Sequence, residues 1–237
     1  MSALFLLRVA AAETSRRGKR LVGPVDLQLD GTGATVVIGP NGSGKTTLLR
    51  LLHGTARLTS GSITWACGTQ EARHHQAFVF QRPVMLRRSV LENLVYPLTI
   101  RGTPKSDARA RAEIWADRLD LTPMLSRSAT VLSGGEQQKL ALARAMITEP
   151  QVLFLDEPCA NLDGRATRAI EGVLQDAKAR GMKLIFATHD MGQARRLADE
   201  IVFILHGRVQ AFAPASDFFE RPEPAQAAAF LKGDILE

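Results

Sequence analysis

The sequence predicts an α/β fold built on a mixed, mainly parallel sheet, with an antiparallel β region at the N-terminus and a helical subdomain inserted later in the chain. Short apolar runs alternate with segments of helical periodicity, which is the pattern of a doubly wound sheet. A glycine-rich loop at 39–46 follows one such run and opens a helix. The stretch 89–148 is mainly helical and interrupts the alternation.

The first part of the chain contains five candidate strands and one helix. The first three strands precede the glycine-rich loop, and an antiparallel β region is expected in this N-terminal part. After the loop, apolar periodicity over 47–52 predicts a helix that ends at Gly54. Apolar and β-branched runs place the strands at 4–9, 25–29, 35–38, 61–65 and 77–80.

The inserted helical subdomain is expected at approximately 89–148. A capping serine predicts a helix from 89 to 96, and the helix breaker Gly-Thr-Pro follows at 102–104. An amphipathic helix rich in arginine and alanine is expected at 106–119. A further helix at 136–148 ends shortly before a proline, and the α/β pattern then resumes.

The last part of the chain returns to alternating strands and helices, as a parallel sheet requires. A glycine at 181 ends one helix, and the pair His206-Gly207 turns between the last two strands. The expected strands are 152–155, 183–187, 201–205 and 208–212, and the expected helices are 165–180 and 191–198.

The bulk composition favours a single domain over residues 1–237. A chain of 237 residues can bury one large α/β core, and no repeat or linker divides it. The longest apolar runs are strand-sized, far below the ~18 residues that cross a bilayer. The net charge of +6 is spread along the chain and selects no partner by itself. Cys67 and Cys159 lack metal-ligand spacing, so reduced thiols are expected.

The glycine-rich loop at 39–46 matches the P-loop pattern and predicts a site for ATP or GTP. Its glycines let backbone N–H groups turn toward a phosphate chain, and the positive end of the next helix faces the same anion. Lys45 is expected to neutralise the β- and γ-phosphates, and the Thr46 hydroxyl is expected to ligate Mg²⁺. The expected nucleotide contacts in this loop are Gly39, Pro40, Asn41, Gly42, Ser43, Gly44, Lys45, Thr46 and Thr47.

Two carboxylates follow the predicted strand at 152–155, at the sheet edge where the phosphates are expected. Asp156 is suited to hold Mg²⁺ through water. Glu157 is placed to polarise the attacking water as a general base. The acid pair therefore predicts hydrolysis of the bound triphosphate.

A second glycine-rich turn opens a helix at 132–139, where the sequence is Leu-Ser-Gly-Gly-Glu-Gln-Gln-Lys. It predicts a second anion-binding helix end without a lysine of its own. Two such ends and one P-loop suit a two-fold dimer, in which Ser133 of one copy reaches the γ-phosphate held by Lys45 of the other. The contacts expected from this turn are Ser133, Gly134, Gly135 and Glu136.

Together these motifs resemble the ATP-binding-cassette (ABC) ATPases over roughly 4–212. The turn at 132–139, lying between the P-loop and the acid pair, is close to diagnostic of that family. The resemblance adds Gln81 as the loop glutamine, 160–163 as the D-loop and His189 as the switch histidine.

The resemblance also implies roles for the added residues. Gln81 would touch Mg²⁺, together with Thr46 and Asp156, and would sense the γ-phosphate. His189 would contact the γ-phosphate and orient the attacking water with Glu157. ATP and Mg²⁺ are therefore the expected ligands.

The chain departs from the family at the adenine contact. The family usually stacks the base on an aromatic residue upstream of the P-loop, but residues 15–20 here read Ser-Arg-Arg-Gly-Lys-Arg. The guanidinium plane of Arg16 or Arg17 is the candidate replacement. Weaker discrimination between ATP and GTP is expected in consequence.

In function, the resemblance is to the ATPase subunits of bacterial importers. The expected assembly is an ATPase homodimer with transmembrane permease subunits at the cytoplasmic face of the inner membrane, served indirectly by a periplasmic solute-binding protein. The permease is expected to dock on 82–90, where Val84, Met85 and Leu86 lie among arginines. Residues 80–93 and the tail at 230–236 look like those of tungstate importers, with phosphate and molybdate systems nearby.

Three other classes of nucleotide-binding protein are alternatives. An exporter-type or cell-division cassette also pairs with a membrane protein. Soluble cassettes that act on ribosomes or DNA usually carry two cassettes or a long coiled-coil insertion, and the sequence has neither, so no nucleic-acid partner is expected. A GTPase switch needs an Asn-Lys-x-Asp motif, which is absent from the sequence.

Overall fold

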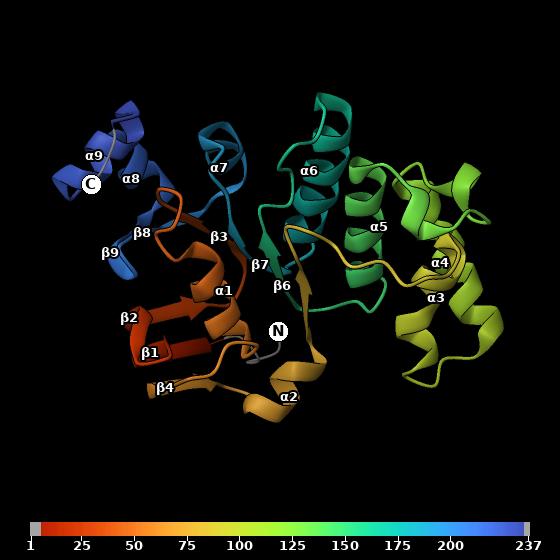
Figure 1. The fold of residues 1–237 in the computed structure, drawn as a ribbon, viewed down its shortest axis with the longest axis horizontal. Coiled ribbons are helices and arrows are strands. Elements are labelled where there is room, and N and C mark those ends of the chain that lie inside the picture. Colours follow the sequence, from red (N-terminus) through yellow and green to blue (C-terminus); the bar gives the residue numbers. More distant parts are fainter. Residues whose placement is uncertain (1–5, 235–237) are drawn as a thin grey trace.

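The computed structural model describes residues 6–234, which form strands and helices in alternation (Figure 1). The strands are β1 (Leu6–Arg16), β2 (Lys19–Asp30), β3 (Gly33–Ile38), β4 (Ser60–Trp65), β5 (Gln76–Val79), β6 (Val152–Asp156), β7 (Lys183–Ala187), β8 (Glu200–Leu205) and β9 (Arg208–Pro214). The helices are α1 (Lys45–His53), α2 (Thr69–His74), α3 (Val90–Thr99), α4 (Lys105–Arg118), α5 (Gly134–Met146), α6 (Gly164–Ala179), α7 (Met191–Leu197), α8 (Ala215–Glu220) and α9 (Ala225–Lys232).

The strands of this described part form two sheets. In the larger sheet the order is β5-β6-β7-β3-β8-β9, with every neighbouring pair parallel except β8 and β9. In the smaller sheet the order is β2-β1-β4, and both pairs are antiparallel. The predicted mixed, mainly parallel sheet with an N-terminal antiparallel region is confirmed.

The central strands are buried on both faces. Because successive side chains of a strand point to opposite faces, the apolar run of β6 contributes to two cores. Leu153 and Leu155 join the core that contains α5 and α6, whereas Val152 and Phe154 join the core that contains α1 and the smaller sheet. Figure 1 shows α1 beside the smaller sheet, with α5, α6 and α7 on the other side of the central strands.

The first two strands are longer than predicted. The expected strand at 4–9 starts outside the described residues at 4 and 5, and β1 continues to Arg16. A two-residue turn, Arg17-Gly18, with φ of 51° and 76°, joins it to β2. The tip of this hairpin carries exposed polar side chains, so apolar periodicity gives no signal for it.

Several helices also differ from the predictions. α2, α8 and α9 lie outside the predicted elements, and each is at most 8 residues long. α3 runs past the expected end at 96, although it contains Pro97 and so loses one helical hydrogen bond. It persists because Leu94 and Leu98 are buried in the core.

The helical region contains α3, α4, α5 and two 3₁₀ turns, Thr122–Met124 and Ala129–Val131. It lies on one side of the molecule, away from the smaller sheet (Figure 1). α5 packs on α3 and α4 and also on β5 and α6. This helix therefore joins the insertion to the sheet.

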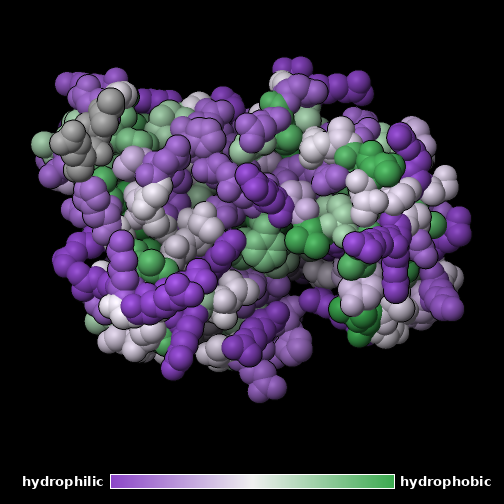
Figure 2. Space-filling view, in the orientation of Figure 1, coloured by the Kyte–Doolittle hydropathy of each residue, from purple (hydrophilic) through white to green (hydrophobic). Residues whose placement is uncertain are grey.

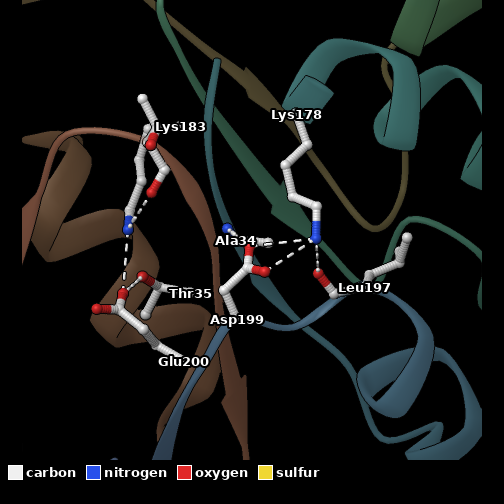
Figure 3. A network of polar contacts seen from close by, with 8 residues as sticks. Ala34, Thr35, Lys178, Lys183, Leu197, Asp199 and Glu200 are labelled. Carbon is white, nitrogen blue, oxygen red and sulfur yellow. Dashed lines mark hydrogen bonds and ion pairs between the residues drawn. The ribbon is translucent and has the colours of Figure 1, made fainter. Parts of the chain in front are cut away.

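An ion pair and a hydrogen bond join β3, β7 and β8 near the amino ends of β7 and β8 (Figure 3). Lys183 Nζ lies 3.0 Å from Glu200 Oε2, and its side chain is 4% exposed. The same Glu200 oxygen accepts a 2.6 Å bond from the Thr35 hydroxyl of β3. Next to it, Asp199 accepts from the Ala34 amide at 2.7 Å and pairs with Lys178 at 3.1 Å.

No helix within 6–234 has the length and apolar composition that crossing a bilayer requires.

His53 ends α1 and packs edge-on against two aromatic rings. Its ring centroid lies 5.2 Å from that of Phe78 and 5.3 Å from that of Phe154. Burial lowers the pKa of His53 from 6.5 to about 4, and the charge of Arg73 acts in the same direction. The buried imidazole is therefore neutral at neutral pH.

We expect His53 to make the fold sensitive to acid. Its folded-state pKa lies below the unfolded value, so its contribution is complete above pH 6.5 and is lost as the pH falls through about 4. His53→Phe should reduce the loss of stability between about pH 7.5 and about pH 4.5 in urea unfolding. An equal loss for the variant and the wild type would contradict this role.

Candidate nucleotide site

The predicted site residues meet at one edge of the large sheet. Because neighbouring parallel strands point the same way, their carboxyl ends lie together. The strands β5, β6, β7 and β3 are adjacent in that order. They are followed, respectively, by Gln81, by Glu157 directly after Asp156, by His189 and by the loop 39–44.

The backbone of the P-loop requires glycine at two positions. Gly39 has φ of 153°, and a Cβ there would collide with the carbonyl oxygen of Ile204. Gly44 has φ of 108°, and a Cβ there would lie 2.8 Å from Cγ2 of Val22. Gly44 is the N-cap of α1, whose first turn has no side-chain cap and no acidic residue. The first N–H groups of α1 lack partners within the helix and suit an anion.

Lys45 is folded back onto the loop. Its Nζ donates to the carbonyl oxygens of Gly39 at 2.8 Å and Pro40 at 3.1 Å. Burial lowers the pKa of Lys45, against the opposing effect of two nearby carboxylates. In the same loop, Ser43 Oγ is buried and has no hydrogen-bond partner among the described residues. An ammonium and an unpaired hydroxyl fit an anion with several oxygen atoms.

Thr46 and Asp156 lie in contact. The Thr46 hydroxyl donates to Asp156 Oδ1 at 2.9 Å, and Asp156 is buried. Burial raises the pKa of Asp156, and the Thr46 hydrogen bond acts in the opposite direction. A hydroxyl and a carboxylate are the oxygen ligands that Mg²⁺ prefers, so this pair fits the expected metal. Gln81, the third expected ligand, instead donates its amide to Glu157 at 2.8 Å.

Glu157 is the point where three loops meet. Its Oε2 accepts the Gln81 amide hydrogen bond and lies 3.3 Å from His189 Nδ1. Its backbone has φ of 48°, and its N–H donates to the carbonyl oxygen of Ala187 at 2.9 Å. The side chain is 13% exposed, so a reactant can reach it. The carboxylate is thus held between a glutamine and a histidine.

A cavity of about 510 Å³ lies over these residues, within the size range of small-ligand sites. Lys45, Thr46, Gln81, Glu157 and His189 all line it. Ala160 and Asn161 line it too. They belong to the stretch 160–163 that the resemblance marks as the D-loop, although they are not among the predicted nucleotide or metal contacts.

The second glycine-rich turn lies elsewhere in the chain. Ser133, Gly135 and Glu136 line a separate cavity of about 270 Å³. This cavity shares no lining residue with the P-loop cavity. One copy of the described chain therefore does not bring Ser133 to its own P-loop, and Gly134 forms the first residue of α5.

Ser133 and Glu136 form a capping box at the start of α5. Ser133 Oγ accepts from the Glu136 amide at 3.4 Å, and the Ser133 amide donates to Glu136 Oε2 at 2.7 Å. These bonds lower the pKa of Glu136. The Ser-x-x-Glu spacing is a known capping signal that the sequence analysis passed over. The Ser133 hydroxyl accepts in this box and can still donate its hydrogen to an anion.

Arg17 is not brought to the P-loop cavity. It lies exposed at the β1–β2 turn and is absent from the residues that line the cavity. The adenine contact of Arg17 therefore stays a prediction.

Comparisons with known proteins agree on one family. The profile described as "ABC transporter" matches residues 22–160. The chain is 36% identical over 249 aligned residues to the phosphate import ATP-binding protein PstB 2 of Natronomonas pharaonis, covering 97% of this chain and 87% of that protein. It is 37% identical over 205 residues to the tungstate uptake system ATP-binding protein TupC of Peptoclostridium acidaminophilum, covering 86% and 96%.

A third relative is the sulfate/thiosulfate import ATP-binding protein CysA 1 of Agrobacterium fabrum, at 35% identity over 219 residues, covering 87% of this chain and 63% of that protein. Among solved structures, one titled "Structure of ATP binding subunit of ABC transporter" has a TM-score of 0.83 at 24% identity, covering 96% of this chain and 99% of that one. That likeness confirms the α/β fold.

We expect ATP and GTP to bind with affinities within about tenfold of each other, because no phenylalanine, tyrosine, tryptophan or arginine lines the described cavity. Titration of both nucleotides against the wild type and Arg17→Ala tests this. A preference for ATP above about 100-fold would contradict it. Unchanged binding of both nucleotides by Arg17→Ala would remove Arg17 from the site.

Proposed function

The chain belongs to the ABC transporter family as an ATPase, and from this premise we propose that it energises the uptake of a small solute through a membrane permease. The observation that carries the proposal is the Glu157 carboxylate, held by Gln81 and His189 beside the P-loop cavity. The three relatives described above are named as import or uptake proteins.

In the proposed reaction, ATP lies over the P-loop with its phosphates at the start of α1. The N–H groups there and the Lys45 ammonium contact the β- and γ-phosphates. To do so, Lys45 exchanges its bonds to the Gly39 and Pro40 carbonyls for bonds to phosphate oxygens. The anion also restores the charged state that burial disfavours at Lys45.

Glu157 is proposed to act as the general base. Its carboxylate accepts a proton from the attacking water, and His189, beside the same oxygen, orients that water and contacts the γ-phosphate. Gln81 donates a hydrogen bond to the carboxylate. It is proposed to sense the γ-phosphate and to link the site to the helical region. When bound, Mg²⁺ would be held by Thr46, Asp156 and Gln81 and would neutralise charge on the phosphates.

Two copies are proposed to form the working unit. Ser133 and the P-loop line separate cavities in one chain, so a two-fold partner is needed to bring Ser133, Gly134, Gly135 and Glu136 to the nucleotide. Each copy then supplies its P-loop to one ATP and its α5 turn to the other. Hydrolysis opens the pair, and this movement is what a permease can use.

The permease is proposed to dock beside α3. The loop after Gln81 is held in place by Asn93, which is fully buried and bonds to the backbone of Leu86, and by Arg144, which donates to the carbonyl oxygen of Val84 at 2.7 Å. The Val84 side chain is left 72% exposed. Figure 2 shows apolar surface among charged side chains over the helical region, as a partly exposed docking face would have.

For the solute, we propose an oxyanion such as tungstate, delivered by a periplasmic binding protein to a permease in the inner membrane, with this subunit on the cytoplasmic face. The similarity to the tungstate protein supports this choice, although the phosphate protein is as similar. The solute itself does not touch this subunit in such systems, so uptake has to be measured on the complex.

Glu157→Gln is expected to lower ATP turnover by about 100-fold or more, because the amide cannot accept the proton. The nucleotide-bound dimer should then accumulate, as size-exclusion chromatography with ATP would detect. Glu113→Gln, at an exposed ion pair of α4, is the matched control and should behave as the wild type. Wild-type turnover by Glu157→Gln would refute the base assignment.

The importer proposal predicts a specific set of partners. The tagged chain should co-purify a permease and a periplasmic solute-binding protein from its host, and vesicles of that complex should take up tungstate. Arg87→Glu, on the proposed docking loop, should lose the permease and uptake while still binding ATP. Arg109→Glu makes the same charge change on exposed α4 and should retain both. Capture of a permease without a binding protein would instead favour an exporter or cell-division complex, and capture of ribosomes would favour a soluble cassette.

A further inference from the structure

A buried polar cluster lies between α6 and α7, next to the loops that carry Glu157 and His189. Glu171 of α6 is buried and accepts two hydrogen bonds from Arg196 of α7, at 2.9 Å from Nε and 2.7 Å from Nη2. Gln193 of α7 is 1% exposed and donates to Glu171 at 3.4 Å. Such bidentate, charge-assisted contacts fix the relative position of two helices.

The cluster reaches both loops directly. The Gln193 backbone N–H donates to Asp190 Oδ1 at 2.9 Å, and Asp190 is the residue after His189. The Gln193 side chain hydrogen-bonds Cys159, which lies two residues after Glu157. Arg196 also lies close to this turn, since a Cβ on Gly192 would be 3.0 Å from both Arg196 Nη1 and Asp190 Oδ1.

Cys159 is a neutral partner in these contacts. Burial raises the pKa of its thiol to about 12, and the charges of Glu171 and Asp190 act in the same direction. A thiol held in this form is a packing group and a weak hydrogen-bonding group, rather than a nucleophile.

We propose that Glu171, Gln193 and Arg196 are positioning residues that set the distance between Glu157 and His189. The inference rests on the proposed function, in which those two side chains share the attacking water. Asp190, which caps α7, directly follows His189. Cys159 lies in the loop after β6, two residues after Glu157. Gln193 contacts both, Asp190 through its backbone N–H and Cys159 through its side chain, and Glu171, fixed by Arg196, accepts a bond from the Gln193 side chain.

The same strands offer a comparison that separates this role from general stability. β6 and β7 end at the site, whereas Lys183 and Glu200 pair at the amino ends of β7 and β8, among the residues of Figure 3. Both pairs join a buried charge to an oppositely charged partner, so removing either carboxylate destabilises the fold. Of the two pairs, Glu171–Arg196 is linked through Gln193 to the loops that follow β6 and β7.

The test measures ATP turnover by the whole chain as Glu171→Gln, Glu200→Gln and wild type, each with and without His189→Ala. We expect Glu171→Gln to lower kcat about tenfold with KM within about twofold, because the P-loop contacts are untouched. Glu200→Gln should lose thermal stability but keep wild-type kcat. In the His189→Ala background, Glu171→Gln should cause no further loss, since both changes disable the same histidine.

A second variant covers the case in which Glu171→Gln fails to fold. Arg196 has a side chain 49% exposed, and Arg196→Lys keeps a positive charge beside the buried Glu171 while losing the two-bond contact of the guanidinium. It should lower kcat in the same way as Glu171→Gln.

Each other outcome has a defined meaning. Wild-type kcat in Arg196→Lys or Glu171→Gln, while Glu157→Gln is inactive, would overturn the inference and leave the proposed function intact. An equal kcat loss in Glu200→Gln, or an additive loss with His189→Ala, would also overturn it. A wild-type chain without ATP turnover would overturn the proposed function, and the inference with it.

Discussion

The parallel order of four adjacent strands is the constraint on which the rest of this structure depends. β5, β6, β7 and β3 all leave the sheet at the same edge, so residues far apart in the chain arrive within one cavity. The close contacts there follow from this order. Glu157 lies 2.8 Å from Gln81 and 3.3 Å from His189, although their positions differ by 76 and 32 residues.

Burial gives the site its electrostatic character. It lowers the pKa of Lys45 and raises the pKa of Asp156, so both groups are held where their charged forms are disfavoured. Each is bonded to its own chain: Lys45 donates to the Gly39 carbonyl, and Asp156 accepts from the Thr46 hydroxyl. A triphosphate and its cation would supply the missing partners, which gives the folded chain a physical reason to bind them.

The second half of the proposed site is placed by the helical region. α5 begins at the Ser133 turn, packs on α3 and α4, and also packs on the sheet and on α6. Arg144, on the same helix, holds the loop that follows Gln81. One helix therefore contacts the proposed docking loop and the sheet and carries the proposed dimer contact at its start.

Much of this site could be predicted from short sequence motifs, because the chemistry of each motif is local. A P-loop needs glycines at fixed spacing, a lysine and a hydroxyl, and these lie within eight residues of sequence. The apolar runs that become β6 and β7 are equally local, since strands buried on both faces must be continuously apolar. The sequence alone therefore determined the fold class, the central strands and the identity of the nucleotide loop.

The tertiary structure decided what depends on distant contacts. The hairpin tip around Arg17 and the short helices α2, α8 and α9 lack a strong apolar period, and their form comes from pairing and from docking on the core. Two further features join segments that no local pattern relates. They are the lining of the P-loop cavity by Asn161 and the Glu171–Gln193–Arg196 cluster. Sequence periodicity reports which face of an element is buried, whereas only the packed chain fixes which side chains meet.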